Sequence, residues 1–316
     1  MQGYGTEAPL VFRGEFPRLK MLNSLYYATW PLGSYATLTH AELLNHDQRV
    51  TLASLLDALT GCMALEGLIL QGYVRLGRGI LHLTPVFLPR LRQIDLVTCD
   101  SALILEHLEA PSLRGPVVVY DSSPRGHILR SLPAHQYDTP YLQGITSLVI
   151  DLTQSPCHFV SGFRADGSCT FYVGVDGAPS RAKRSWTQLS FVTVASFSPF
   201  FNIRSLTLVT DALTVSWELW LPNLNFLVEF TVSCPRLDNL ISALLAPLDT
   251  RLPSLQRLTL RRFGIFAILD HRNLMAFVLY RYEAGSPLRQ LQFDREEWER
   301  IQKRDETWVL LVKSQC

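Results

Sequence analysis

The chain has 316 residues, of which 47% are hydrophobic and 18% are charged, and its net charge is +1. Division after residue 158 gives 11 basic and 13 acidic residues in the first half and 18 and 15 in the second, so the halves carry −2 and +3. Phosphate neutralisation dominates nucleic-acid binding, and neither half shows a clustered basic excess. We therefore expect no nucleic-acid partner.

The sequence also argues against export, a membrane span and a metal site. The first residues include Glu7, Arg13 and Glu15 and contain no apolar core of signal-peptide length. The uncharged run 185–203 contains Pro199 and is a poor membrane span. Six cysteines are scattered without a C-x-x-C pair or zinc-like spacing to histidine. We expect a soluble cytoplasmic or nuclear protein with reduced thiols, no metal, no cofactor and no membrane partner.

An apolar triplet, L-x-x-L-x-L with Ile, Val or Phe allowed, recurs along the chain. Most steps between triplets span 22 to 33 residues, and the step from Ile150 to Leu208 is about double. Self-similarity at this period predicts an irregular leucine-rich-repeat solenoid of the α/β class, with parallel strands on a concave face and helices and loops on a convex face. The third apolar residue of the triplet falls at Leu43, Leu70, Leu96, Val118, Ile150, Leu208, Val232, Leu260 and Phe293.

Several segments that connect the predicted strands have apolar residues at helical spacing. One connecting segment lacks this spacing. An Asp-Gly pair at 166–167 and another at 176–177 bracket an alternating strand, which predicts an irregular β-meander over 159–195. The apolar stripes of the helical segments predict packing behind the strands. The expected helices run from a cap at Asp47 to Gly61, from a cap at Asp100 through Ser101 to Glu109, from Arg236 to Leu245, and from a cap at Asp270 through His271 to Ala284.

The repeat array is expected to be capped at one end only. Asp294 and Glu297 have capping-box spacing and open a charged helix followed by an apolar run, which suits a unit that covers the last repeat. No such cap precedes Phe16, which predicts a truncated start. The expected organisation is an N-terminal extension over 1–15, the array over 16–293 and a capping segment over 294–316.

If the triplets face the core, the residues flanking their last two apolar positions line the concave face, because alternate strand residues point to opposite sides. One interpretation is a groove for a peptide or protein. The other is that strands simply favour Val and Thr, and that a loop or helix covers the valines. The candidate partner-binding residues are Glu42, Ile69, Asp95, Val117, Val149, Thr207, Thr231, Arg257, Thr259, Arg261 and Gln292.

The motifs of catalysis and nucleotide binding are missing, including G-x-S-x-G, G-x-x-x-x-G-K-[ST] and H-E-x-x-H. Cys157 and His158 are the closest Cys/His pair, and adjacent strand residues point to opposite faces, so they cannot share a ligand or a proton. We expect a protein without catalytic residues. An unrecognised α/β enzyme stays an alternative, because catalytic sites are recognised by geometry.

Successive phrases of the chain carry a family resemblance. LLDALTGCMALEGLIL, FLPRLRQIDLVTCD, LILEHLEAPSLRGPVVVYD and SPLRQLQFDREEWERI resemble the leucine-rich-repeat portion of F-box proteins of mushroom-forming fungi, over most of the span from Phe16 to Val312. The resemblance implies the substrate-recognition subunit of an SCF-type ubiquitin ligase, in which the F-box binds a Skp1-type adaptor and the repeats hold the target protein.

The chain departs from that family at its start. No F-box of the L-P-x-E-[IL]-L type precedes the repeats, so a Skp1-type adaptor is an expected partner only if an F-box lies upstream. The leading hypothesis is a non-catalytic scaffold for protein recognition. The alternative from another class is a truncated structural fragment without a ligand of its own.

Overall fold

The computed structural model describes residues 18–25, 35–46, 51–72, 83–98, 101–121, 141–153, 157–176, 202–211, 215–245, 252–262 and 269–293. This part of the chain is α/β, with mostly parallel strands and few helices. It divides into two compact units, the first made of Met1–Gln143 and Cys169–Asp176, the second of Gly144–Ser168 and Gly177–Cys316. The expected extension 1–15, the capping segment 294–316 and the meander residues after 176 lie outside the described residues.

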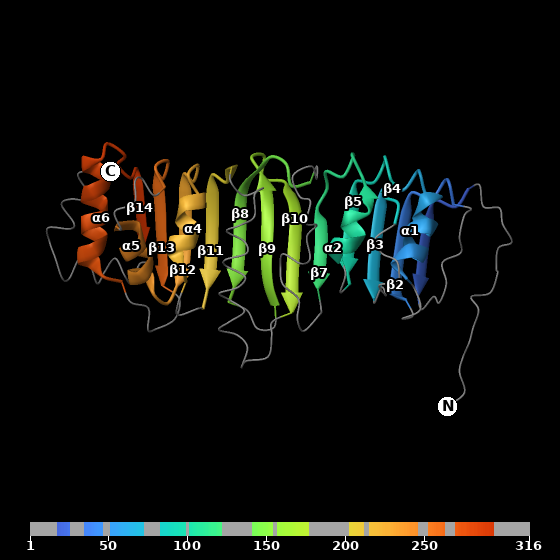
Figure 1. Ribbon diagram of the computed structural model, residues 1–316, viewed down its shortest axis with the longest axis horizontal. Helices are drawn as coiled ribbons and strands as arrows, with labels where there is room; N and C mark the ends of the chain where they lie inside the picture. The colour runs from blue at the N-terminus through green and yellow to red at the C-terminus, as the bar shows by residue number, and fades with distance from the viewer. Residues whose placement is uncertain are drawn as a thin grey trace, which may run out of the picture. The chain divides into compact units, whose positions relative to one another are not determined.

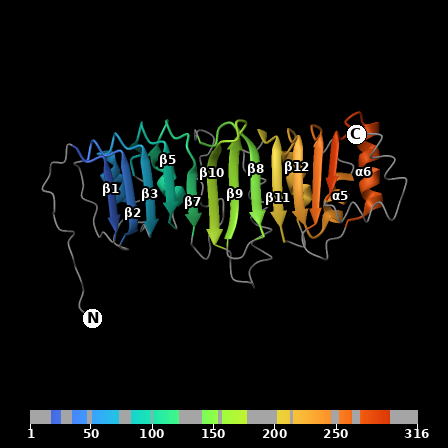
Figure 2. The ribbon, with the colours of Figure 1, turned by 180° about the vertical axis from the view of Figure 1, so that it is seen from behind.

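The first unit is a parallel sheet with helices on one face. Figure 1 shows α1 (Leu52–Thr60) and α2 (Ser101–Glu106) in front of the strands, and Figure 2 shows no helix on the opposite face of this unit's described part. A small parallel pair, β4 (Val86–Phe87) with β6 (Leu108–Glu109), accompanies them. The strands follow the order β1 (Met21–Leu25), β2 (His40–His46), β3 (Gly67–Gly72), β5 (Gln93–Val97), β7 (Val117–Asp121) and β10 (Cys169–Asp176).

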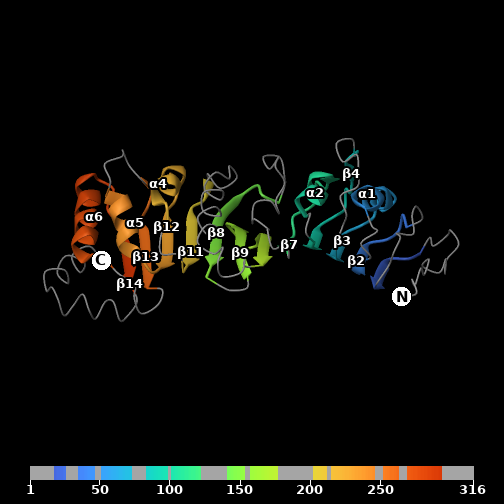
Figure 3. The ribbon, with the colours of Figure 1, turned by 60° about the horizontal axis from the view of Figure 1, so that its bottom comes forward.

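The second unit repeats this arrangement, with one antiparallel strand at its edge. β9 (Cys157–Arg164) pairs antiparallel with β8 (Ile145–Leu152). Parallel strands β11 (Ser205–Thr210), β12 (Glu229–Cys234), β13 (Arg257–Arg262) and β14 (Gln290–Phe293) continue the sheet. Figure 3 shows the helices of this unit on one side of its strands, namely α4 (Trp217–Trp220), which continues into the short η4 (Leu221–Asn223), α5 (Leu237–Leu245) and α6 (His271–Glu283). None of the helices in the described ranges has the length and apolar character needed to cross a membrane.

The same backbone turn introduces most of the parallel strands. The last residue of this lead-in turn is a leucine that is at most 6% exposed. The backbone N–H groups of the next two residues both donate to one backbone carbonyl, that of the residue just before the preceding strand. Because the carbonyl of one turn accepts from the next, the turns stack and set the register of the sheet. The shared acceptors are Lys20, Thr39 and Glu66 in the first unit and Arg204, Val228 and Gln256 in the second.

The triplet residues form the buried faces of the strands, as predicted, at most positions. Leu43, Leu70 and Leu96 in the first unit are no more than 1% exposed, and so are Ile150, Leu208, Val232 and Leu260 in the second. Phe293, on the last described strand, is partly exposed. The triplet pattern therefore identified the core side of the strands, except at β7.

On β7 the predicted alternation is wrong by one residue. Val117 and Val119 are both fully buried, and Val118 aligns with Asp95 on the other face of the sheet. Val117 therefore cannot line a partner-binding face. The reason is one extra residue, since three residues separate Leu113 from Val117 where two separate Leu91 from Ile94.

A Gly-Pro pair accommodates this extra residue. The N–H of Gly115 donates to the carbonyl of Arg92 at 2.9 Å, while Pro116 has no N–H and cannot form the second bond of the usual pair. A Cβ atom on Gly115 would lie 2.5 Å from the carbonyl oxygen of Arg92, so only glycine permits this close approach.

The predicted helices are present, with differences at their ends. Thr51 rather than Asp47 is the N-cap of α1, and its side chain accepts from the backbone N–H of Ser54. α2 is shorter than predicted because the chain turns into β6 at Leu108. α5 and α6 agree with prediction, and Asp270 caps α6 by accepting from two backbone N–H groups of the first turn.

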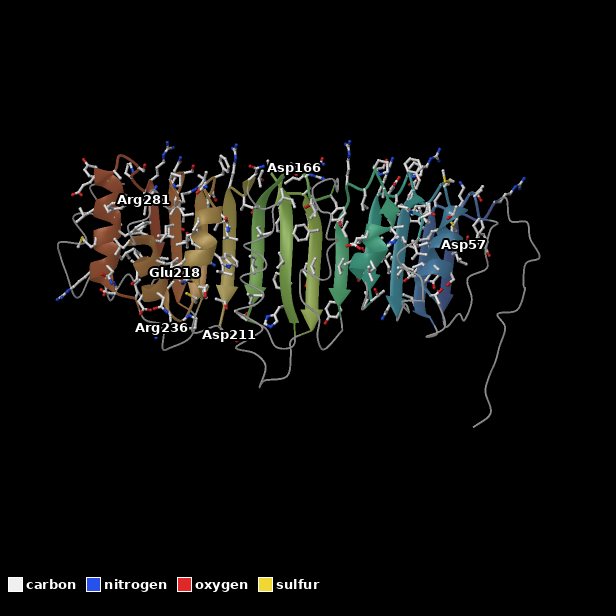
Figure 4. The ribbon with its side chains drawn as sticks, viewed as in Figure 1. Asp57, Asp166, Asp211, Glu218, Arg236 and Arg281 are labelled. Atoms are coloured by element: carbon white, nitrogen blue, oxygen red, sulfur yellow. The ribbon has the colours of Figure 1, made fainter. Side chains whose placement is uncertain are left out.

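Arg281 of α6 (Figure 4) is buried without a described carboxylate partner. It is 5% exposed, and burial lowers its pKa. Its guanidinium donates to the carbonyls of Ser286 and Leu252 at 2.9 Å, Leu255 at 2.8 Å and Pro253 at 3.4 Å. Leu252 has a φ of 55°, in the left-handed region that non-glycine residues seldom adopt. Arg281 thus joins α6 to the turn that leads into β13.

Two buried thiols give a simple test of the core. Cys62 and Cys234 are each 1% exposed, and burial raises their pKa values to about 11 and about 12. Because the thiolate is the reactive form, we expect both to resist iodoacetamide at pH 8 in the folded protein and to be alkylated in urea. Mass spectrometry of tryptic peptides measures this. Equal labelling rates in the two conditions would contradict the burial of these two thiols.

Candidate functional site

The candidate site is the helix-free face, defined here for each unit as the face of its strands that carries no described helix (Figure 2). Strand register aligns one central residue per strand on this face. In the first unit these are Asn23, Glu42, Ile69, Asp95, Val118 and Tyr172. In the second unit they are Ser161, Val149, Thr207, Thr231, Thr259 and Gln292.

The structure brings most sequence-predicted residues together within their own unit. Glu42, Ile69 and Asp95 are neighbours in the first unit, and Val149, Thr207, Thr231, Thr259 and Gln292 are neighbours in the second. Arg257 and Arg261 flank Thr259 at alternate positions of β13 and so share its face. Val118 takes the place that was predicted for Val117.

Asp95 is the most unusual group of this face. Its cross-strand neighbours are Ile69 and Val118, both apolar. The Oδ1 atom is buried and accepts no hydrogen bond from any described group, while Oδ2 accepts a long bond of 3.5 Å from the Nε2 of Gln93. Burial therefore raises the pKa of this carboxyl, against a smaller lowering effect from Gln93.

The other carboxylate of the column has a partner within it. Glu42 accepts a 2.7 Å hydrogen bond from the Nδ2 of Asn23 on the neighbouring strand. Of the two acidic side chains in this column, Asp95 is therefore the one with an oxygen atom that lacks a donor among the described residues.

Two tyrosine rings extend the apolar part of the first unit's face. Tyr120 aligns with Gly174, and Tyr172 lies two residues before Gly174 on the same face of β10. A Cβ on Gly174 would lie 2.9 Å from Cδ2 of Tyr120 and 3.3 Å from Cε1 of Tyr172, so both rings lie over this glycine. The alternation of apolar residues along β10 predicts that Tyr172 points away from the core. The pairing of β10 with β7 is a long-range contact, which sequence periodicity does not reveal.

The second unit presents a more hydroxylated face, on which two pairs of polar side chains interact. Arg257 forms an ion pair with Glu229 on the neighbouring strand β12, so the charge of this predicted partner-binding residue is partly neutralised. The hydroxyl of Thr259 donates to Oε1 of Gln292 at 3.3 Å. Arg261 remains an exposed cation on this face.

Strand β9 adds two aromatic residues that the sequence analysis did not select. Phe159 aligns with Asp151 and Phe163 with Ser147, which places both rings on the helix-free face of the second unit. Ser161 lies between them and is only 5% exposed. The period-2 spacing of Phe159, Ser161 and Phe163 was the available signal for this strand.

The described residues contain no group of three or more His, Cys, Asp or Glu side chains arranged to hold a metal ion. Comparison of the chain with protein-family models, curated proteins and solved structures found no match.

The environment of Asp95 predicts a pH-dependent stability. A raised carboxyl pKa in the folded state means that stability is fully present below the unfolded pKa of about 3.9 and is lost as pH rises through the folded pKa. Asp95→Asn should therefore raise the free energy of unfolding at pH 7, by about 1 kcal/mol or less because the carboxylate is partly exposed, and leave it unchanged at pH 3. Urea denaturation at both pH values measures this. A destabilised variant at pH 7 would show that Asp95 has a stabilising partner in the folded chain.

Proposed function

We propose that the chain is a non-catalytic scaffold for protein recognition, built as an irregular leucine-rich-repeat solenoid. The stacked lead-in turns support the repeat interpretation, because buried leucine and shared carbonyl recur from strand to strand in each unit. In a solenoid each repeat contacts its neighbours and the strands together form one continuous binding surface.

The observation that carries the proposal is that, in each unit, one face of the parallel sheet carries no described helix. Parallel sheets are normally covered on both faces, and the described helices cover only one face in each unit. The other face presents partly exposed apolar side chains such as Ile69, Val118 and Val149. Covering this surface with a partner would remove apolar area from water, which favours binding by roughly 25 cal/mol per Å².

We further propose that the scaffold is the substrate-binding part of an SCF-type ubiquitin ligase. This link depends on the resemblance of the repeat phrases to fungal F-box proteins, and it requires an F-box in the natural full-length product. Affinity purification of that product, followed by mass spectrometry, should recover a Skp1-type adaptor and a cullin. Recovery of neither would defeat the ubiquitin link and leave the recognition scaffold intact.

A face variant separates target binding from adaptor binding in the same experiment. Thr231→Arg adds a long cation to the centre of the helix-free face and should remove target proteins from the purified set. Asp57→Arg makes the same kind of change on α1 (Figure 4), and the target proteins should remain in the purified set. Both variants should retain the adaptor. Loss of targets with Asp57→Arg and not with Thr231→Arg would contradict the assignment of the face.

A further inference from the structure

We propose that Asp95 anchors a lysine or arginine side chain of the bound protein, within an extended segment that has apolar residues beside the cation. This inference rests on the proposed function, because it assigns the chemistry of the partner that the first unit's helix-free face would take.

One carboxylate oxygen of Asp95 lacks a hydrogen-bond donor among the described residues. The Oδ1 of Asp95 is buried and has no described donor, and among the described residues only Gln93 donates to Oδ2, at 3.5 Å. A buried acceptor without a partner carries an energetic penalty, and a charge-assisted hydrogen bond is the strongest way to remove it. A bound ammonium or guanidinium group that reaches the partly exposed side of this carboxylate would supply such a bond.

The sheet around Asp95 lacks basic side chains of lysine or arginine on its strands. The six strands of the first unit's sheet contain no lysine or arginine, and the described acidic side chains on its helix-free face are Glu42 and Asp95. No lysine or arginine of these strands can therefore neutralise Asp95. The helix-free face of the second unit differs, since it carries Arg257, which pairs with Glu229, and the exposed Arg261. Charge complementarity thus points to a cationic partner for the first unit's face.

Apolar side chains surround the carboxylate of Asp95 on the helix-free face. Ile69 and Val118 flank Asp95 across the strands, and Val97 lies two residues further along β5 on the same face. The methylene stem of lysine or arginine can pack on such residues while its charged end reaches the carboxylate. Tyr172 lies two strands away, about 10 Å at the usual strand spacing, where its ring can contact an apolar neighbour of the cation.

The test selects binding peptides and does not require that the partner be identified. A phage-displayed library of random dodecapeptides is panned on the full chain at physiological ionic strength, in parallel on wild type, Asp95→Asn and Glu42→Gln. Glu42→Gln is the matched control, because it removes a carboxylate of the same column that already accepts from Asn23. Thermal denaturation shows first that each variant is folded.

We expect lysine or arginine next to apolar residues to be enriched on wild type and on Glu42→Gln, and this enrichment to disappear on Asp95→Asn. Synthetic peptides from the wild-type pool should bind Asp95→Asn at least about tenfold more weakly, as loss of one charge-assisted hydrogen bond implies. Basic enrichment that persists on Asp95→Asn would overturn the inference, and so would a wild-type pool without basic residues.

A further variant distinguishes failure of this inference from failure of the proposed function. Ile69→Arg places a bulky cation beside Asp95 and should abolish binding of any peptide that uses this face. A pool without basic residues that still loses binding on Ile69→Arg would refute the Asp95 anchor and retain the recognition face. If Ile69→Arg leaves binding of the selected peptides unchanged, both the Asp95 anchor and the recognition face of the first unit are refuted.

Discussion

Replacement of Val117 with aspartate is expected to unfold the first unit, with a loss of about 4 kcal/mol or more in the free energy of unfolding. Val117 is fully buried, between Ile94 on β5 and Phe171 on β10. A carboxylate there would be removed from water without a partner, which is among the most destabilising changes that a core can undergo. Urea denaturation followed by circular dichroism measures the loss.

The adjacent residue supplies the control. Val118 is partly exposed and faces the helix-free side, so Val118→Asp should leave the chain folded. The pair tests the position of the extra residue at Gly115 and Pro116, since the alternation first predicted from the sequence gives the opposite outcome. A folded Val117→Asp with an unfolded Val118→Asp would show that the register of β7 is wrong.

Replacement of Arg281 with methionine is expected to destabilise the second unit by about 3 kcal/mol. The change keeps an unbranched side chain of similar length and removes the donors to four backbone carbonyls. Buried carbonyls that lose their donor incur a desolvation penalty, and the left-handed conformation of Leu252 loses the bond that holds it. Thermal or urea denaturation checks the magnitude.

Arg272→Met is the matched control on the same helix. Arg272 is exposed, so its replacement should change the free energy of unfolding by about 0.5 kcal/mol at most. Equal effects of the two substitutions would mean that Arg281 does not hold the turn before β13. Arg281→Lys should recover only part of the loss, because an ammonium has three donors at one nitrogen and cannot reach all of these carbonyls.

Much of the fold followed from local patterns in the sequence. The triplets predicted the buried faces of β3, β5 and β12 because strand alternation and burial produce the same period. The predicted ends of α6 at Asp270 and Ala284 agree with the structure, since the N-cap and the positive φ of the following Gly285 are local requirements.

The sequence did not predict features that depend on distant contacts. The shift at β7 arises because Gly115 passes close to the carbonyl of Arg92, a contact with the preceding repeat. The pairing of β10 with β7 joins segments about 50 residues apart and places Tyr172 on the helix-free face. Asp95 was selected as one of many face residues, and only the geometry shows that its Oδ1 lacks a described donor.

Site-specific photocrosslinking tests most directly whether the helix-free face binds a partner. A benzophenone amino acid replaces Ile69 or Thr231 on that face, and Asp57 or Glu218 on helices α1 and α4 (Figure 4), in the tagged natural product expressed in its own cells. We predict discrete crosslinked adducts from Ile69 and Thr231 and none from Asp57 and Glu218. Adducts from the helix positions alone would contradict the proposed recognition face.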